Sequence, residues 1–216
     1  MPSFPLRVPS INAPASIAFT LLFAQVIIPW TGTYFASQDG PSHLYTAHVA
    51  KHLLLPTNSG YDSVYELARK VTSNWGTVLL FNISVAAVGA DNAEKMLTSL
   101  CFVIGFLSMT YFVRSLSPQE SPWTPVSNFL STTWFLWAGF YNFYLAMIVS
   151  PLLVGYYIRR ANRLTWRHAA ALATGIAVQF LVHVLPALVT VTLISCVASW
   201  LNVVVPTAVQ DKLGPR

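Results

Sequence analysis

The residue best suited to chemistry in this sequence is one carboxylate that follows the first long apolar run. Asp39 stands in the stretch Ser37-Gln38-Asp39-Gly40-Pro41-Ser42-His43. Beside a membrane surface, a carboxylate can act as general base toward an incoming hydroxyl or hold a divalent cation against a phosphate. The alternative is that Asp39 caps the helix that Gly-Pro introduces. Asp39 is therefore the candidate catalytic residue and a candidate metal ligand.

Three histidines follow Asp39 within the same segment. His43 lies four residues later, where it can hydrogen-bond Asp39 or a ligand phosphate. His48 and His52 are also four residues apart, a spacing that puts two imidazoles on one helix face and lets them share a metal. The alternative for His48 and His52 is that they are polar residues on the wet face of an amphipathic helix.

Two more polar residues lie inside apolar runs. Intramembrane ionisable residues usually mark function, which makes His183 a candidate; its alternative role is to bind a carbonyl group that Pro186 frees. Asn142 lies among aromatic residues, which suits either an isoprenoid or sugar surface or an aromatic belt at the membrane interface. The predicted substrate-binding residues are His43, Asn142 and His183.

The composition indicates an integral membrane protein. Of the 216 residues, 55% are hydrophobic and only 9% are charged, whereas about 25% are charged in soluble domains. The net charge of +5 is interpreted through topology, because no cluster of Lys and Arg with interleaved aromatic residues indicates nucleic acid. Cys101 and Cys196 fall inside apolar runs and are predicted to be small core residues. We expect a lipid bilayer as partner and no nucleic acid.

The apolar runs predict an all-α, polytopic bundle of about six membrane spans in a single transmembrane domain. The first span is interpreted as an uncleaved signal anchor. The two longest runs, 126–158 and 169–205, exceed the roughly 20 residues that one span requires, so each is divided in two. The natural breaks are at Gly139-Phe140-Tyr141-Asn142 and at Pro186. The expected spans lie near 17–35, 93–113, 126–138, 140–158, 169–184 and 186–205.

Residues 36–92 are predicted to form a loop with juxtamembrane helices at Pro41 to Leu55, Tyr61 to Val71 and Thr77 to Ala90. The last would be about 21 Å long against a hydrocarbon core of about 30 Å, so we expect it to lie in the outer leaflet. This topology puts eight of the 12 basic residues on the side of the termini, whereas a crossing helix would leave two. The positive-inside rule therefore predicts cytoplasmic termini and an outside loop.

The order of these features resembles the amino-terminal half of bacterial GT-C-fold membrane glycosyltransferases. In that fold, the first outside loop carries two juxtamembrane helices and a catalytic acid near its start. The resemblance implies that Asp39 is this acid and that Thr77 to Ala90 is the second juxtamembrane helix. It rests on Asp39-Gly-Pro-Ser-His43, Ala93-Glu94-Lys95, Gly139-Phe140-Tyr141-Asn142-Phe143 and His183-Val-Leu-Pro186.

The resemblance implies a polyprenyl-phosphate-linked sugar as donor, inversion at the anomeric carbon, and a divalent cation, Mg or Mn. It also implies the plasma (bacterial inner) membrane. Family enzymes are much longer and many have a pair of acids in this loop, so we expect a fragment, a split subunit or an inactive relative. The alternative function is a non-enzymatic transporter or assembly subunit. Against that alternative stand the absence of paired intramembrane charges and of an obvious internal repeat.

Overall fold

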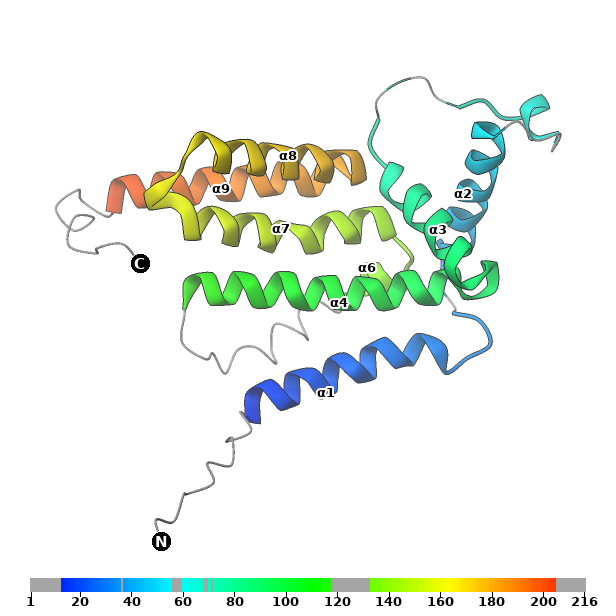
Figure 1. The fold of residues 1–216 in the computed structure, drawn as a ribbon, viewed down its shortest axis with the longest axis horizontal. Coiled ribbons are helices and arrows are strands. Elements are labelled where there is room, and N and C mark those ends of the chain that lie inside the picture. The colour runs from blue at the N-terminus through cyan, green and yellow to red at the C-terminus, as the bar shows by residue number, and fades with distance from the viewer. Residues whose placement is uncertain are drawn as a thin grey trace, which may run out of the picture.

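The computed structural model describes residues 13–35, 37–55, 60–67, 70, 72–117 and 133–204, and these residues form helices joined by turns, without strands. Five helices lie alongside one another as a bundle, and α2 and α3 run across one end of it (Figure 1). The bundle helices are α1 (Ala13–Ile27, continued by η1, Ile28–Trp30), α4 (Ala90–Leu116), α7 (Tyr141–Arg160), α8 (Trp166–Val182) and α9 (Val184–Val204). The shorter elements are α2 (Gly40–Leu54), η2 (Tyr61–Ser63), α3 (Trp75–Val88), α6 (Trp134–Trp137) and η3 (Ala161–Arg163).

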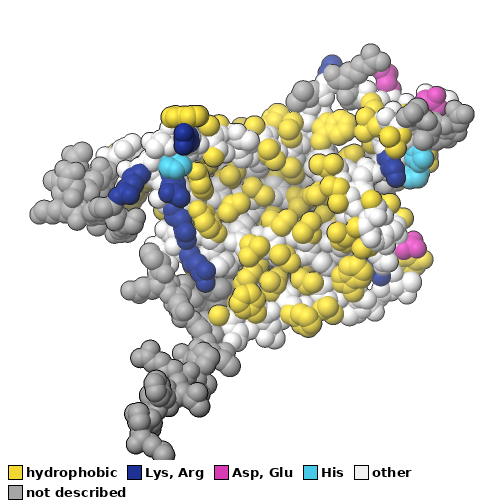
Figure 2. Space-filling model, viewed as in Figure 1, with side chains coloured by type: hydrophobic (Ala, Val, Ile, Leu, Met, Phe, Trp, Pro, Cys, Tyr) yellow, Lys and Arg dark blue, Asp and Glu magenta, His cyan; other side chains and the backbone are white. Residues whose placement is uncertain are grey.

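Three helices in the described part of the chain, α4, α7 and α9, are long and apolar enough to cross a membrane. In the apolar stretch of α7, 56% of the residues are buried, whereas in that of α9 only 17% are buried. Helix α7 is therefore central, and α9 presents apolar side chains outward. Figure 2 shows apolar side chains spread over the surface between the two ends of the bundle. A soluble protein rarely exposes so large an apolar surface, and these features indicate a membrane protein.

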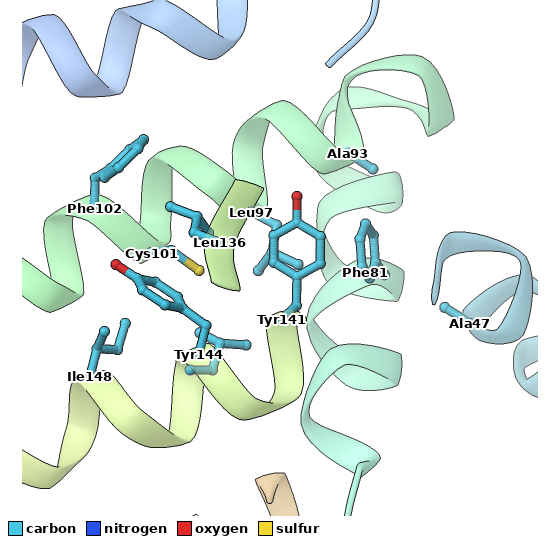
Figure 3. Packing of buried hydrophobic residues seen from close by; sticks show 11 residues of the cluster. Ala47, Phe81, Ala93, Leu97, Cys101, Phe102, Leu136, Tyr141, Tyr144 and Ile148 are labelled. Carbon is cyan, nitrogen blue, oxygen red and sulfur yellow. The ribbon is translucent and has the colours of Figure 1, made fainter. Parts of the chain in front are cut away.

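The core lies where α7 packs on α4 and α3. Tyr141 and Tyr144 of α7 point toward Leu97 and Cys101 of α4, and Phe81 of α3 closes the cluster (Figure 3). The two tyrosines and Phe81 are fully buried. Close packing of these side chains holds the helices together at the end of the bundle where α2 and α3 lie.

Two local features bring α4 and α7 close together along their length. Pro151 interrupts the hydrogen-bond ladder inside α7, and the neighbouring Leu152 amide donates instead to Ser108 Oγ of α4 at 3.0 Å. At Gly155 the backbones nearly touch, because an added Cβ would lie 3.0 Å from Phe112 Cα. The pair α4 and α7 therefore forms a fixed frame for the other elements.

The predicted helix breaks are confirmed. α7 begins just after Gly139, whose φ of +81° turns the chain out of α6. His183 is extended between α8 and α9, and Pro186 lies in the first turn of α9, where its missing amide costs no helical hydrogen bond. The break is thus centred on His183, three residues before the proline that predicted it.

Other sequence predictions need correction. The helix predicted at Tyr61 to Val71 is wrong, because only η2 forms and residues 65–67 are not helical. There the Tyr61 ring packs against the rings of α2, and tertiary contacts outweigh local helix propensity.

The first apolar helix ends at Trp30, short of residue 35. Cys101 is buried as predicted, but Cys196 is exposed because it lies on α9. Most of the predicted span 126–138 lies outside the described residues.

The two ends of the bundle differ in charge. We call the end that carries η3 the arginine end; its exposed basic residues include Arg114, Arg159, Arg160, Arg163 and Arg167. We call the end that carries α2 and α3 the pocket end, and the acidic side chains visible in Figure 2 lie there. Figure 1 shows the start of α1 and the end of α9 at the arginine end. Helices α2 and α3 therefore lie at the end opposite both, as the sequence predicts for the juxtamembrane helices.

Candidate functional site

A polar cavity of about 640 Å³ lies at the pocket end. It brings together all four residues that the sequence predicts for catalysis and substrate binding. Asp39 and His43 come from the start of α2, Asn142 from the start of α7, and His183 from the break before α9. The other lining residues are Ser42, Thr46, Asn74, Thr77, Val78, Phe135, Phe140, Phe143 and Leu185.

Four helices begin at this cavity. The residues directly before α2, α3, α7 and α9 are Asp39, Asn74, Phe140 and His183, and all four line it. A helix N-terminus carries free amide groups and roughly half a positive charge, so their convergence favours a negatively charged ligand group. The described lining contains no Lys or Arg. The helix ends therefore supply partial positive charge, and the histidines can supply hydrogen-bond donors.

The Asp39 carboxylate faces the cavity without capping α2. Asp39 occupies the N-cap position, yet its side chain makes no capping hydrogen bond. The Gly40 amide donates instead to Ser37 Oγ at 3.0 Å. The capping interpretation of Asp39 is therefore wrong, because a hydroxyl two residues earlier serves the helix end. The Asp39 backbone is also fixed, since its amide donates to the Ala138 carbonyl at 3.1 Å.

His43 stands beside Asp39 and is half-buried. Its ring meets the Tyr141 ring edge-on, with centroids 6.3 Å apart. Burial lowers the pKa of His43 below its usual value of 6.5, while the charge of Asp39 and a hydrogen bond to the Gly139 backbone oppose that shift. His43 is consequently a neutral imidazole at neutral pH, able both to donate and to accept a hydrogen bond.

Asn142 is buried and does not belong to an aromatic belt at a surface. Its Oδ1 accepts the Thr77 amide at 3.0 Å and so caps α3 across 65 residues of sequence. This bond satisfies one of the amides that a helix N-terminus leaves free. Asn142 therefore helps to form the cavity wall as well as to line it.

His183 lines the cavity and packs edge-on against the Phe143 ring, with the ring centroids 5.4 Å apart. Its Nδ1 accepts the Leu185 amide at 3.2 Å. The hydrogen bonds among the described residues do not pair His183 with a carbonyl freed by Pro186: the ring accepts the Leu185 amide, and the Val182 carbonyl, four residues before Pro186, accepts the Asn74 amide at 3.1 Å. A neutral imidazole that accepts at Nδ1 carries its proton on Nε2, which leaves a donor for a ligand.

His48 and His52 do not reach the cavity. Their rings are 4.5 Å apart, and each lies 5.7 Å from the Tyr61 ring, so the three pack as an aromatic group on another face of α2. Among the described residues, no group of three or more His, Cys, Asp or Glu could hold a metal ion. A divalent cation would fit best at Asp39, where a ligand phosphate and water would complete its oxygen ligands.

Glu94 is a buried acid beside the cavity whose contacts are not predicted from the sequence. This α4 residue is 8% exposed, and its Oε1 accepts hydrogen bonds from Ser37 Oγ and from Tyr141 Oη, the latter at 2.9 Å. Tyr141 Oη also pairs with Thr98 Oγ1 at 3.0 Å. The signal was present, because an acid at the head of an apolar span needs a partner, but the partners are 57 and 47 residues away.

An apolar groove of about 500 Å³ lies next to the polar cavity. It runs between α4, α7 and α9, and it shares Phe143 and Leu185 with the cavity. At its far end it reaches Leu116 and Ile158, near the arginine end. Its described lining is apolar apart from Ser150. A polar chamber and an apolar channel thus meet at two shared side chains.

Comparison of the chain with protein-family models, with curated proteins and with solved structures finds no match. The class that the fold and cavity define is therefore an all-helical bundle with three candidate membrane spans among its described residues. Function must be argued from the cavity itself.

Proposed function

We propose that this chain is a membrane glycosyltransferase, or a truncated relative of one, that uses a polyprenyl-phosphate-linked sugar as donor. The observation that carries the proposal is that the polar cavity and the apolar groove are neighbours and share Phe143 and Leu185 as lining residues. A lipid-linked sugar has a charged phosphate between a polar sugar and a long apolar chain. Such a ligand matches the change from polar to apolar lining.

In this proposal the donor phosphate lies near the four helix N-termini, where partial positive charge favours an anion. His183 Nε2 and His43 donate hydrogen bonds to it, and Asn142 keeps α3 in place beside it. The isoprenoid chain lies in the groove against the side chains of α7 and α9. Because lipid tails are as apolar as the groove, the groove serves to place the chain, and the affinity must come mainly from the polar contacts of the phosphate and sugar.

Asp39 is the proposed general base. Its carboxylate takes the proton from an acceptor hydroxyl while the hydroxyl oxygen forms a bond to the anomeric carbon. The bond from that carbon to the phosphate oxygen breaks, and its electron pair leaves with polyprenyl phosphate. Attack opposite to the leaving group inverts the anomeric carbon. A divalent cation, Mg or Mn, held by Asp39 and the donor phosphate would neutralise charge on the leaving group.

We also propose about six membrane crossings, with both termini in the cytoplasm and the pocket end outside the plasma (bacterial inner) membrane. The gathering of arginines at the opposite end supports this orientation. The juxtamembrane helices would then be α2 and α3, with α3 in the outer leaflet.

Cysteine labelling tests the orientation. The exposed Cys196 is first replaced by serine, and Cys101 can remain because it is buried. Asp62 and Arg163 are both exposed and lie at opposite ends. A membrane-impermeant maleimide applied to intact cells should label Asp62→Cys, whereas Arg163→Cys should react only after permeabilisation. The reverse pattern would overturn the orientation, and labelling of both in intact cells would overturn the bundle as a membrane-spanning unit.

Substitution of Asp39 tests the activity. Purified protein in proteoliposomes is given a panel of polyprenyl-phosphate sugars, and release of polyprenyl phosphate is measured with acceptor extract present. Asp39→Asn should lower the rate by at least about 100-fold, because a positioned general base contributes roughly 10²–10⁴ to a rate. Asp62→Asn, which removes an exposed acid outside the cavity, is the matched control and should retain the wild-type rate.

The outcomes separate the two functions that the sequence leaves open. An Asp39→Asn protein that still transfers sugar at the wild-type rate would remove Asp39 from the mechanism. A wild-type protein that binds the donor lipid but releases no polyprenyl phosphate with any sugar in the panel would favour a non-enzymatic assembly subunit.

A further inference from the structure

We propose that Glu94 is the positioning residue of the site: its buried carboxylate holds the segment that carries Asp39 at the cavity wall. The catalytic consequence rests on the proposed function, but the positioning itself does not. Glu94 does not line the cavity, so it acts through other residues and is not a catalytic group.

A chain of hydrogen bonds links Glu94 to the backbone beside Asp39. Ser37 Oγ donates to Glu94 Oε1, and the same hydroxyl oxygen accepts the Gly40 amide at 3.0 Å. The carboxylate of α4 is therefore connected through one side chain to the first amide of α2. Tyr141 Oη donates to the same Glu94 oxygen, which ties this connection to α7.

Close packing fixes the same segment from two sides. A Cβ on Gly40 would overlap the Glu94 carboxylate, so α2 begins in direct contact with α4. A Cβ on Gly139 would lie 2.8 Å from the Gly40 amide nitrogen and 2.9 Å from that of Asp39. The Asp39 backbone is thus held between the Glu94 side chain and the turn before α7.

The residue type matters because a buried carboxylate is costly unless hydrogen bonds compensate it. Here one oxygen accepts two hydroxyl donors that come from different parts of the fold. A glutamine in this place keeps an acceptor oxygen of the same reach, whereas alanine removes it and leaves both donors without it. The proposal therefore predicts that Glu94→Gln and Glu94→Ala behave differently.

Amide hydrogen exchange of the purified protein measures positioning directly, on a peptide that covers residues 37–45. Glu94→Ala and Ser37→Ala should both speed exchange of the Asp39 and Gly40 amides by about 10-fold or more, while Glu94→Gln should stay within about threefold of wild type. Ser99→Ala is the matched control: Ser99 is a buried α4 residue whose hydroxyl donates to the Val26 carbonyl instead. It should leave this peptide unchanged.

Unchanged exchange in a folded Glu94→Ala protein would overturn the proposal. If Glu94→Ala does not fold, Ser37→Ala decides, because it removes only one hydroxyl, and unchanged exchange there has the same meaning. Exchange is measured without substrate, so this result stands apart from the proposed function. In an active protein, Ser37→Ala should lower kcat about 10-fold with KM for the donor within twofold; a rise in KM alone would contradict a role in placing the base.

Discussion

The two ends of the bundle use polar residues in opposite ways. At the pocket end, Glu94 and Asn142 are buried and bond to elements far away in the sequence. At the arginine end, the basic side chains are exposed, and two of them lie over aromatic rings. Arg159 lies over the Tyr111 ring at 4.3 Å, and Arg167 over the adjacent Trp166 ring at 5.7 Å.

This difference separates two roles of polar residues: fixing the positions of atoms in the fold, and setting the orientation of a chain in a membrane. Buried hydrogen bonds between distant elements fix atoms in place, and they are lost if any one element moves. Exposed arginines place little demand on geometry, because their effect on membrane orientation depends on the side of the membrane and not on a contact. The pocket end is therefore where small changes should have large structural effects.

The largest expected effect comes from two glycines with the same φ of +81°. Gly139→Ala drives a Cβ into the Asp39 and Gly40 backbone, while the site of a Cβ on Gly89 is open. Gly89→Ala should cost about 1–3 kcal/mol from its backbone conformation alone, because a φ of 81° with a ψ of 166° is essentially confined to glycine. Gly139→Ala adds overpacking and should cost about 1–3 kcal/mol more. Thermal unfolding in one detergent measures both, and equal losses would show that the segment is not tightly held.

A smaller effect is expected from a pair of helix caps. Asn142→Ala leaves the buried Thr77 amide without its acceptor and should cost about 1–3 kcal/mol. Thr165→Ala removes the exposed local cap of α8 at the arginine end and should cost about 1 kcal/mol. Asn142→Asp keeps an acceptor at the same place and should retain most of the stability. A Thr165→Ala loss larger than that of Asn142→Ala would reverse the comparison.

The smallest effect concerns pH. Because burial lowers the native pKa of His43 below the unfolded value of 6.5, the unfolded chain binds a proton first as the pH falls. The contribution of His43 to stability is thus complete above pH 6.5 and declines as the pH falls from there through the native pKa. His43→Gln should flatten the stability profile in this window. The measurement is chemical unfolding at several pH values, and an unchanged slope would show that His43 is not buried.

The sequence predicted the fold well where the signals are local. Runs of apolar residues located α4, α7 and α9 within a few residues, and Gly139 and Pro186 marked breaks that the structure contains. The prediction of a helix at Tyr61 to Val71 failed, because only the short helix η2 forms there. The rings of α2 determine the conformation there, and a helical pattern in the sequence does not report such contacts.

The four predicted site residues that line the cavity were chosen from their types. A lone acid or histidine beside an apolar span is unusual in any fold, and Asn142 is a polar amide among aromatic residues. Their roles were less visible. The sequence could not show that Ser37 caps α2 in place of Asp39, or that Asn142 caps α3. The sequence also could not show that His48 and His52 face away from the cavity, because the orientation of each side chain depends on how α2 packs against its neighbours.

The sequence by itself therefore determined the helical, membrane-protein character of the chain, its break points and its candidate residues. Hydropathy, helix length and proline or glycine placement act over a few neighbouring residues, so they can be read from local order. Only the tertiary structure decided that four helix N-termini meet at one cavity and that an apolar groove lies beside it. The contact between Glu94 and the segment that carries Asp39 was likewise decided by the tertiary structure. Those properties depend on side chains that are distant in sequence and adjacent only after packing.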